Sequence, residues 1–177
     1  MIKQFKIYNS EFRIKIIVAL VILIAVFLRL HNLSSVPPSA SLDEASIGWN
    51  AYSILKTGGD EYGTKFPMLL RAYDDWRPAL YVYLVIPFVK LVGLNVLAVR
   101  LPSFILSITT VLATYFLVHE LTRISKIRIN ANMLGLLSAF LLAISPWHIY
   151  ISRLGHEANA GLAFIIFAIL FISNIYT

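Results

Sequence analysis

The feature that most constrains this fold is a set of four long apolar segments. A helix needs about 20 mainly apolar residues to cross a bilayer, and the four segments approach that length. Charged residues make up only 14% of the chain, where a soluble domain has roughly 25%. We therefore predict an all-α membrane protein, a single membrane domain spanning residues 1–177, with four transmembrane helices. They are expected at about 14–31, 101–118, 133–150 and 158–176.

The basic residues orient these helices. Four of them precede the first apolar run, and three lie between the second and third spans. Basic segments favour the cytoplasmic side of a membrane. Both lie on that side only if the interrupted apolar segment Ala79–Leu97 rests on the outer surface. We predict a multi-pass cell-membrane protein with a cytoplasmic N-terminus and a long external loop, about 31–100.

The external loop is expected to contain two juxtamembrane surface helices, at about 42–56 and 79–93. The chain stops directly after an apolar run, and its external loop is elaborate for four helices to support. We therefore expect these 177 residues to be the N-terminal part of a larger multi-spanning bundle, without turnover on their own.

Six of the nine acidic residues lie in this loop as adjacent pairs. They are Asp43-Glu44, Asp60-Glu61 and Asp74-Asp75. Carboxylates near a bilayer are costly and often mark function. The first pair also fits a simpler role, because Ser41 and Glu44 have the spacing of a helix-capping box. The sequence leaves both open, a salt-bridged loop or an active site.

The same loop is rich in cations and aromatic residues. An Arg fork suits a phosphate, while pairing with the acids or with lipid headgroups is the alternative. Aromatic side chains at this level serve as interfacial anchors or as platforms for sugar rings. The cations are Lys56, Lys65, Arg71, Arg77 and Arg100, and the aromatic residues are Trp49, Tyr52, Tyr62, Tyr73, Trp76, Tyr81 and Tyr83.

Other functions find little support. The chain has no cysteine, and its four histidines show no ligand spacing, so we predict no metal site and no cofactor. The net charge of +6 is not gathered in a basic run with interleaved aromatics, and we expect no nucleic-acid partner. The apolar segments are almost free of charge, which disfavours a transporter, whose ionisable groups lie near the midplane.

Several motifs in order resemble a known family. Leu42-Asp43-Glu44-Ala45 opens a helix ending in Lys56-Thr57-Gly58, and Asp74-Asp75-Trp76-Arg77-Pro78, Ala98-Val99-Arg100-Leu101-Pro102 and Ser145-Pro146-Trp147-His148 follow. The pattern resembles the N-terminal part of the C-type glycosyltransferase superfamily (GT-C), polytopic membrane enzymes. It is most similar to the branch of the protein O-mannosyltransferases and the lipid A aminoarabinose transferase.

The resemblance implies a function. Such enzymes transfer a sugar from a polyprenyl-phosphate donor to a protein, lipid or glycan on the extracytoplasmic face. By similarity, Asp43 is the catalytic base of an inverting glycosyltransferase and Glu44 completes its Asp-Glu motif. Glu157 stands where the family often has Asp. A phosphomonoester leaving group does not demand a metal.

The remaining site residues follow from that chemistry. A departing phosphate needs cations where its charge develops, and Arg77 and Arg100 are the candidates. Asp74, Asp75 and Glu157 are expected to contribute to substrate binding. A non-enzymatic membrane protein, such as a transporter part or an assembly subunit, and an inactive relative of the family remain alternatives. The effect of Asp43→Asn on transfer distinguishes them.

Overall fold

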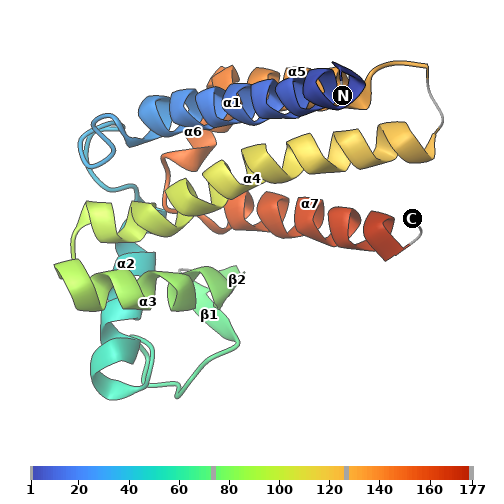
Figure 1. Cartoon of the computed structure of the whole chain (residues 1–177). Coiled ribbons are helices and arrows are strands. Elements are labelled where there is room, and N and C mark those ends of the chain that lie inside the picture. The colour runs from blue at the N-terminus through green and yellow to red at the C-terminus, as the bar shows by residue number, and fades with distance from the viewer. Residues whose placement is uncertain (1, 73–74, 126–127, 176–177) are drawn as a thin grey trace. The chain divides into compact units, whose positions relative to one another are not determined.

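A computed structural model of the chain describes residues 2–72, 75–125 and 128–175, which form seven helices and one two-stranded hairpin (Figure 1). The helices are α1 (Ile2–Leu30), α2 (Leu42–Thr57), α3 (Leu80–Val92), α4 (Val96–Ile124), α5 (Ala131–Ile144), α6 (Pro146–Ser152) and α7 (Glu157–Ile175), and the strands are β1 (Leu69–Ala72) and β2 (Asp75–Pro78). The predicted helical class is confirmed, and the hairpin is an addition to it.

The chain divides into two compact units, each built from separate stretches of sequence. The helical unit comprises Met1–Leu28, Ile108–Ile149 and Leu162–Thr177. The loop unit comprises Arg29–Ser107 and Tyr150–Gly161, and so covers the whole range of the predicted external loop. Every residue of the candidate site described below belongs to the loop unit.

Two helices of the described residues, α4 and α7, are long and apolar enough to cross a membrane. The pair α5 and α6 qualifies as a third if it counts as one span. The protein therefore has the character of a membrane protein, while the predicted count of four spans is not confirmed. In α1, Lys15 and Arg29 limit the unbroken apolar run to thirteen residues.

The segment predicted as one span at about 133–150 is broken. Helices α5 and α6 meet at a bend of 62°. Ser145 between them has extended backbone, φ −60° and ψ 118°. Proline disfavours helical geometry in the residue before it, and Pro146 therefore ends α5 and begins α6.

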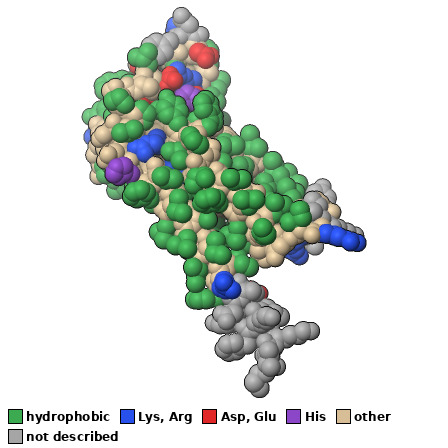
Figure 2. Space-filling model, turned by 90° about the horizontal axis from the view of Figure 1, so that it is seen from above, with side chains coloured by type: hydrophobic (Ala, Val, Ile, Leu, Met, Phe, Trp, Pro, Cys, Tyr) green, Lys and Arg blue, Asp and Glu red, His purple; other side chains and the backbone are tan. Residues whose placement is uncertain are grey.

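The helical unit has its own apolar core. Its helices pack closely at Gly135, where an added Cβ would lie 2.8 Å from the Tyr115 carbonyl oxygen. The Tyr115 hydroxyl donates a hydrogen bond to Asn132 at 2.9 Å. Many large apolar side chains remain exposed, and they predominate on the face in Figure 2. The buried core comprises Val21, Ala25, Val111, Tyr115, Ala139 and Ala143.

The loop unit is built on α2 and α3, which pack against each other (Figure 1). Helix α2 ends at Gly58, whose positive φ of 75° suits a left-handed cap. The Tyr81 hydroxyl donates to the Val99 carbonyl at 2.9 Å and accepts from the Ser103 N–H at 3.2 Å. It thus bridges one turn of α4 next to Pro102, which lacks an N–H. The buried core comprises Ile47, Ala51, Ile54, Leu70, Ala79, Tyr81, Val82, Val85, Val89, Ala98, Val99 and Ala160.

The hairpin was not predicted. Its strands are only four residues long, and Leu69 pairs with Pro78 while Ala72 pairs with Asp75. Alternate residues of β1 are buried, as expected for a strand with one face on a core. The hairpin is joined to α3 because the Ala79 N–H donates to the Met68 carbonyl.

Candidate functional site

The N-terminus of α2 carries the first acid pair. Ser41 caps the helix, since its hydroxyl accepts from the Glu44 N–H while the Glu44 carboxylate accepts from the Ser41 N–H, at 3.2 and 3.0 Å. The predicted capping box is confirmed. It also separates the pair, because the Asp43 side chain is 36% exposed and the Glu44 side chain only 1%.

Glu44 is fully engaged. Its Oε1 accepts from Arg100 Nε at 2.7 Å and from the Gly155 N–H at 2.9 Å. Its Oε2 accepts from Arg100 Nη2 at 3.1 Å and from the Ser41 N–H. Burial raises the pKa of Glu44, but these hydrogen bonds and the Arg100 charge outweigh it and leave the pKa below its ordinary value.

Arg100 is equally engaged. The buried guanidinium makes five hydrogen bonds, two to Glu44 and one each to the carbonyls of Leu33, Pro37 and Ser39 at 2.9–3.0 Å. A guanidinium has five N–H donors, so none is left for a ligand. The expected role of Arg100 in holding a phosphate does not fit this position. Arg100 instead joins the start of α4 to α2 and to the turn before it.

A second arginine, which the site prediction missed, supports the same turn. Arg153 Nε donates to the Val36 carbonyl at 3.0 Å, and its Nη2 donates to the His31 carbonyl at 2.6 Å. Two residues later, Gly155 lies so close to α4 that an added Cβ would be 2.8 Å from the Val99 carbonyl oxygen. Residues 153–155 thereby fix the start of α7 beside α2.

Around the exposed Asp43 lies a group of polar side chains, here called the carboxylate cluster, formed by Asp43, Arg77, His156 and Glu157. Arg77 Nη2 lies 2.5 Å from Asp43 Oδ1. His156 Nε2 lies 3.5 Å from Asp43 Oδ2, and its Nδ1 lies 3.5 Å from Glu157 Oε2. The structure therefore brings together three predicted site residues, Asp43, Arg77 and Glu157, and adds His156.

His156 orients the cluster. Its Nδ1 accepts a hydrogen bond from the Ala158 N–H at 3.2 Å. A neutral imidazole with Nδ1 as acceptor carries its proton on Nε2. That tautomer, assigned from the hydrogen-bond pattern, presents an N–H to Asp43. The sequence held no sign of this role, since His156 lacks metal-ligand spacing and its partner lies far away in the chain.

The cluster is open on one side and closed on the other. All four side chains are partly exposed. Arg77 Nη1, however, is buried and has no hydrogen-bond partner among the described residues. A hollow beside it, lined in part by Asn50, Tyr81 and Glu157, has a volume of about 10 Å³. By this measure one water molecule needs about 10–15 Å³, so the hollow has no room for a sugar, which must approach Asp43 from the solvent side.

The other predicted acids lie elsewhere. Asp75, on β2, accepts from the Trp76 N–H at 2.7 Å and is exposed. Its expected part in substrate binding gains no support from this position. Asp74 and Tyr73 lie outside the described residues. Glu61 exchanges hydrogen bonds with Asn50 of α2, both at 3.0 Å.

No arrangement for a metal ion occurs among the described His, Asp and Glu side chains. In comparisons with known proteins, the chain matches no family model, no curated protein and no solved structure. The geometry of the loop unit is therefore the basis for the functional proposal.

Proposed function

We propose that this protein is a membrane glycosyltransferase that uses a polyprenyl-phosphate-linked sugar. The observation that carries the proposal is the unequal placement of the Asp-Glu pair. Glu44 is locked in the interior by Arg100 and Gly155, whereas Asp43 stays exposed beside a cation and a histidine. The buried ion pair of Glu44 and Arg100 has a structural role. Of the two acids, only Asp43 is placed to meet a substrate.

The proposed reaction is an inverting transfer to an acceptor hydroxyl or amine. The acceptor atom attacks the anomeric carbon as the bond from that carbon to the phosphate oxygen breaks. The electron pair leaves with polyprenyl phosphate, and the acceptor proton passes to Asp43 as general base. His156 orients the Asp43 carboxylate for this step.

Arg77 is the proposed phosphate ligand. In the absence of substrate its guanidinium is paired with Asp43. A donor phosphate offers a charge-assisted, bidentate partner. Transfer of Arg77 from Asp43 to the phosphate would release the carboxylate as the donor binds. Glu44 and Arg100 then act as positioning residues rather than as catalytic ones.

The location of this chemistry is part of the proposal. The prenyl tail remains in lipid, so Asp43 must lie at the membrane surface. An apolar hollow of about 270 Å³ next to Glu44, lined by Gly48, Leu94 and Val99 among others, offers room for the first part of the tail. We propose four spans, with a cytoplasmic N-terminus and the loop unit on the extracytoplasmic side of the cell membrane.

Cysteine labelling tests the topology without background, because the chain has no cysteine. Lys65→Cys in the loop unit and Arg128→Cys between α4 and α5 are both at exposed positions. A membrane-impermeant maleimide should label the first in intact cells and the second only after lysis. The reverse pattern would contradict the proposed orientation.

Transfer itself is tested in membranes that contain the complete enzyme, because residues 1–177 alone are expected to lack turnover, with a panel of labelled polyprenyl-phosphate sugars. Asp43→Asn should abolish transfer while donor binding persists, and Arg77→Gln should weaken donor binding. Asp75→Asn is the matched control, since it removes an exposed acid of the same type outside the cluster. If Asp43→Asn changes nothing, the ion pair with Arg77 is structural, and the chain is a non-enzymatic membrane protein or an inactive relative.

A further inference from the structure

A second hollow in the loop unit lies outside the carboxylate cluster. Its volume is about 410 Å³, and it is lined by Asp60, Tyr62, Thr64, Arg71 and Trp76. This volume is within the roughly 300–1,000 Å³ of small-molecule sites. None of these residues has a part in the proposed reaction, because the hollow lies on the face of the hairpin opposite to Arg77.

The hairpin presents its two faces to different places. Arg71 is directly opposite Trp76, and Leu70 is opposite Arg77. Side chains directly opposite in an antiparallel pair lie on the same face. Leu70 is buried in the core of the loop unit. Arg71 and Trp76 therefore share the outer face, and the hollow is separated by the hairpin from Asp43.

The hollow contains two charges of opposite sign that do not neutralise each other. Asp60 is held in place because its Oδ1 accepts from the N–H groups of Tyr62 and Thr64, at 3.0 and 2.7 Å. The Arg71 guanidinium lies over the Tyr62 ring, 5.5 Å from its centroid. Among the described residues no ion pair or hydrogen bond joins Arg71 to Asp60 or to another carboxylate.

Two large aromatic side chains complete the walls. Tyr62 is 57% exposed and Trp76 is 63% exposed. Neither has a core to fill, and Arg71 fixes the Tyr62 ring from one side. An exposed indole beside fixed hydrogen-bonding groups combines an apolar contact face with polar specificity.

These groups select a neutral, hydroxyl-rich ligand. An anion would meet the like charge of Asp60 and a cation that of Arg71, so neither sign of net charge matches both groups. A hydroxyl both donates and accepts, so one hydroxyl of a sugar can donate to Asp60 while its neighbour accepts from Arg71. The C–H face of the ring can then pack on Trp76. We infer that this hollow is a binding subsite for a neutral sugar residue; its identification with the acceptor glycan rests on the proposed transfer.

Anchoring in the membrane is the competing explanation for exposed aromatic residues. Contact with the bilayer would take the exposed Arg71 guanidinium out of water without a carboxylate partner, which is unfavourable. A sugar hydroxyl supplies a hydrogen-bond partner for it. The two explanations differ in what touches Trp76, and this can be measured directly.

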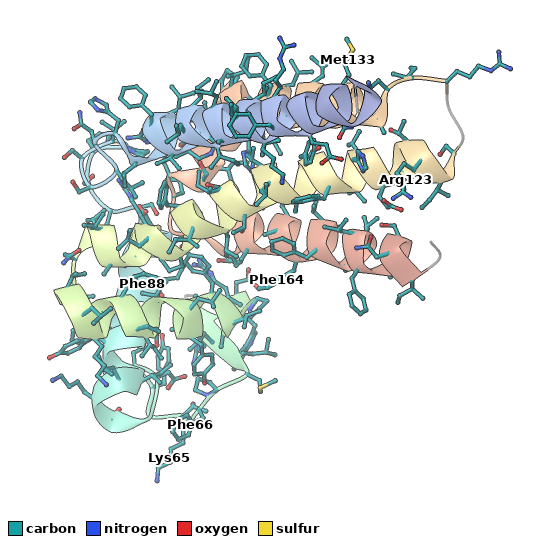
Figure 3. The ribbon with its side chains drawn as sticks, viewed as in Figure 1. Lys65, Phe66, Phe88, Arg123, Met133 and Phe164 are labelled. Carbon is teal, nitrogen blue, oxygen red and sulfur yellow. The ribbon has the colours of Figure 1, made fainter. Side chains whose placement is uncertain are left out.

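The double substitution Trp49→Phe and Trp147→Phe leaves Trp76 as the single tryptophan of the three. This protein, in phosphatidylcholine nanodiscs free of sugar detergents, is titrated with neutral mono- and disaccharides and with glucuronate. We expect a saturable change in Trp76 emission with at least one neutral sugar. Arg71→Met should weaken binding about tenfold or more. Lys65→Met is the control, since this cation projects from the end of the loop before β1 (Figure 3).

Several outcomes would overturn the subsite. They are no response to any sugar, equal binding by the Arg71→Met protein, or quenching of Trp76 by brominated lipids without a sugar response, which would establish membrane anchoring. The assay contains no donor and does not require Asp43. Sugar binding that survives in a protein without transfer activity would leave the subsite intact and remove only its acceptor role.

Discussion

Arg100→Met is expected to be among the most destabilising substitutions in the loop unit. It would leave the buried Glu44 carboxylate without its cation and three backbone carbonyls without their donor. Removal of one partner of a buried ion pair costs about 3–5 kcal/mol. Total stabilities are only about 5–15 kcal/mol, so a large share of the unfolding free energy is at stake.

A double-mutant cycle isolates the pair. Glu44→Leu alone should also be strongly destabilising, because it leaves Arg100 buried and partly unpaired. The combined Glu44→Leu and Arg100→Met protein should be more stable than the sum of the two losses by about 1–3 kcal/mol. Denaturant unfolding in nanodiscs, followed by the emission of Trp49 and Trp76 in the loop unit with Trp147 replaced by Phe, gives these free energies.

Two results would refute the reasoning. One is a loss below about 1 kcal/mol for Arg100→Met, the level of an exposed ion pair. The other is simple additivity in the cycle. Either result would mean that the buried hydrogen bonds of Arg100 do not stabilise the loop unit. A role of Arg100 at the donor phosphate would then be possible.

Two further substitutions and one change of pH test the contacts that hold the loop unit together. Gly155→Ala should cost about 1–3 kcal/mol in denaturant unfolding, because its Cβ would meet the Val99 backbone; an unchanged midpoint would contradict the close approach. Tyr81→Phe should cost about 1–3 kcal/mol in the same assay by leaving Val99 and Ser103 unpaired, and a neutral effect would contradict the bridge. Because the folded pKa of Glu44 is lowered, stability should fall as the pH decreases below the ordinary glutamate pKa of about 4.3, and Glu44→Gln should flatten that decrease; an unaltered pH profile would contradict it.

Gly161→Ala is the matched control for the glycine test. Its Cβ would meet no atom within 4 Å. An alanine in helix α7 should therefore leave stability unchanged or raise it slightly. Equal losses for Gly155→Ala and Gly161→Ala would show that the cost is general to the segment.

The bounds of α2 and α3 were predictable because their signals are local. The expected 42–56 is observed as Leu42–Thr57, and the expected 79–93 as Leu80–Val92. Helix α2 has a capping box and a glycine C-cap, and helix α3 has a mainly apolar sequence that ends at Gly93. Pro146 is a helix-breaking signal in the sequence. The break was nevertheless not predicted, because the residues on both sides of Pro146 are apolar and were read as one span. The hairpin was missed because four-residue strands are too short to show a period.

The division of labour within the acid pair could not be predicted. Asp43 and Glu44 are neighbours in sequence. Glu44 is buried because of partners 56 and 111 residues away from it in the chain. Arg100 and Arg77 looked equivalent in sequence for the same reason. His156 gave no signal at all, because it acts on Asp43 through the fold rather than through spacing in the chain.

The most direct test of the account is the transfer rate of Asp43→Asn relative to Asp75→Asn, measured in the same membranes with the same labelled polyprenyl-phosphate sugar. Loss of a general base predicts a decrease of about 10²- to 10⁴-fold for Asp43→Asn alone, with unfolding free energies equal in the two proteins. Transfer by Asp43→Asn at the rate of the unsubstituted protein would contradict the central claim.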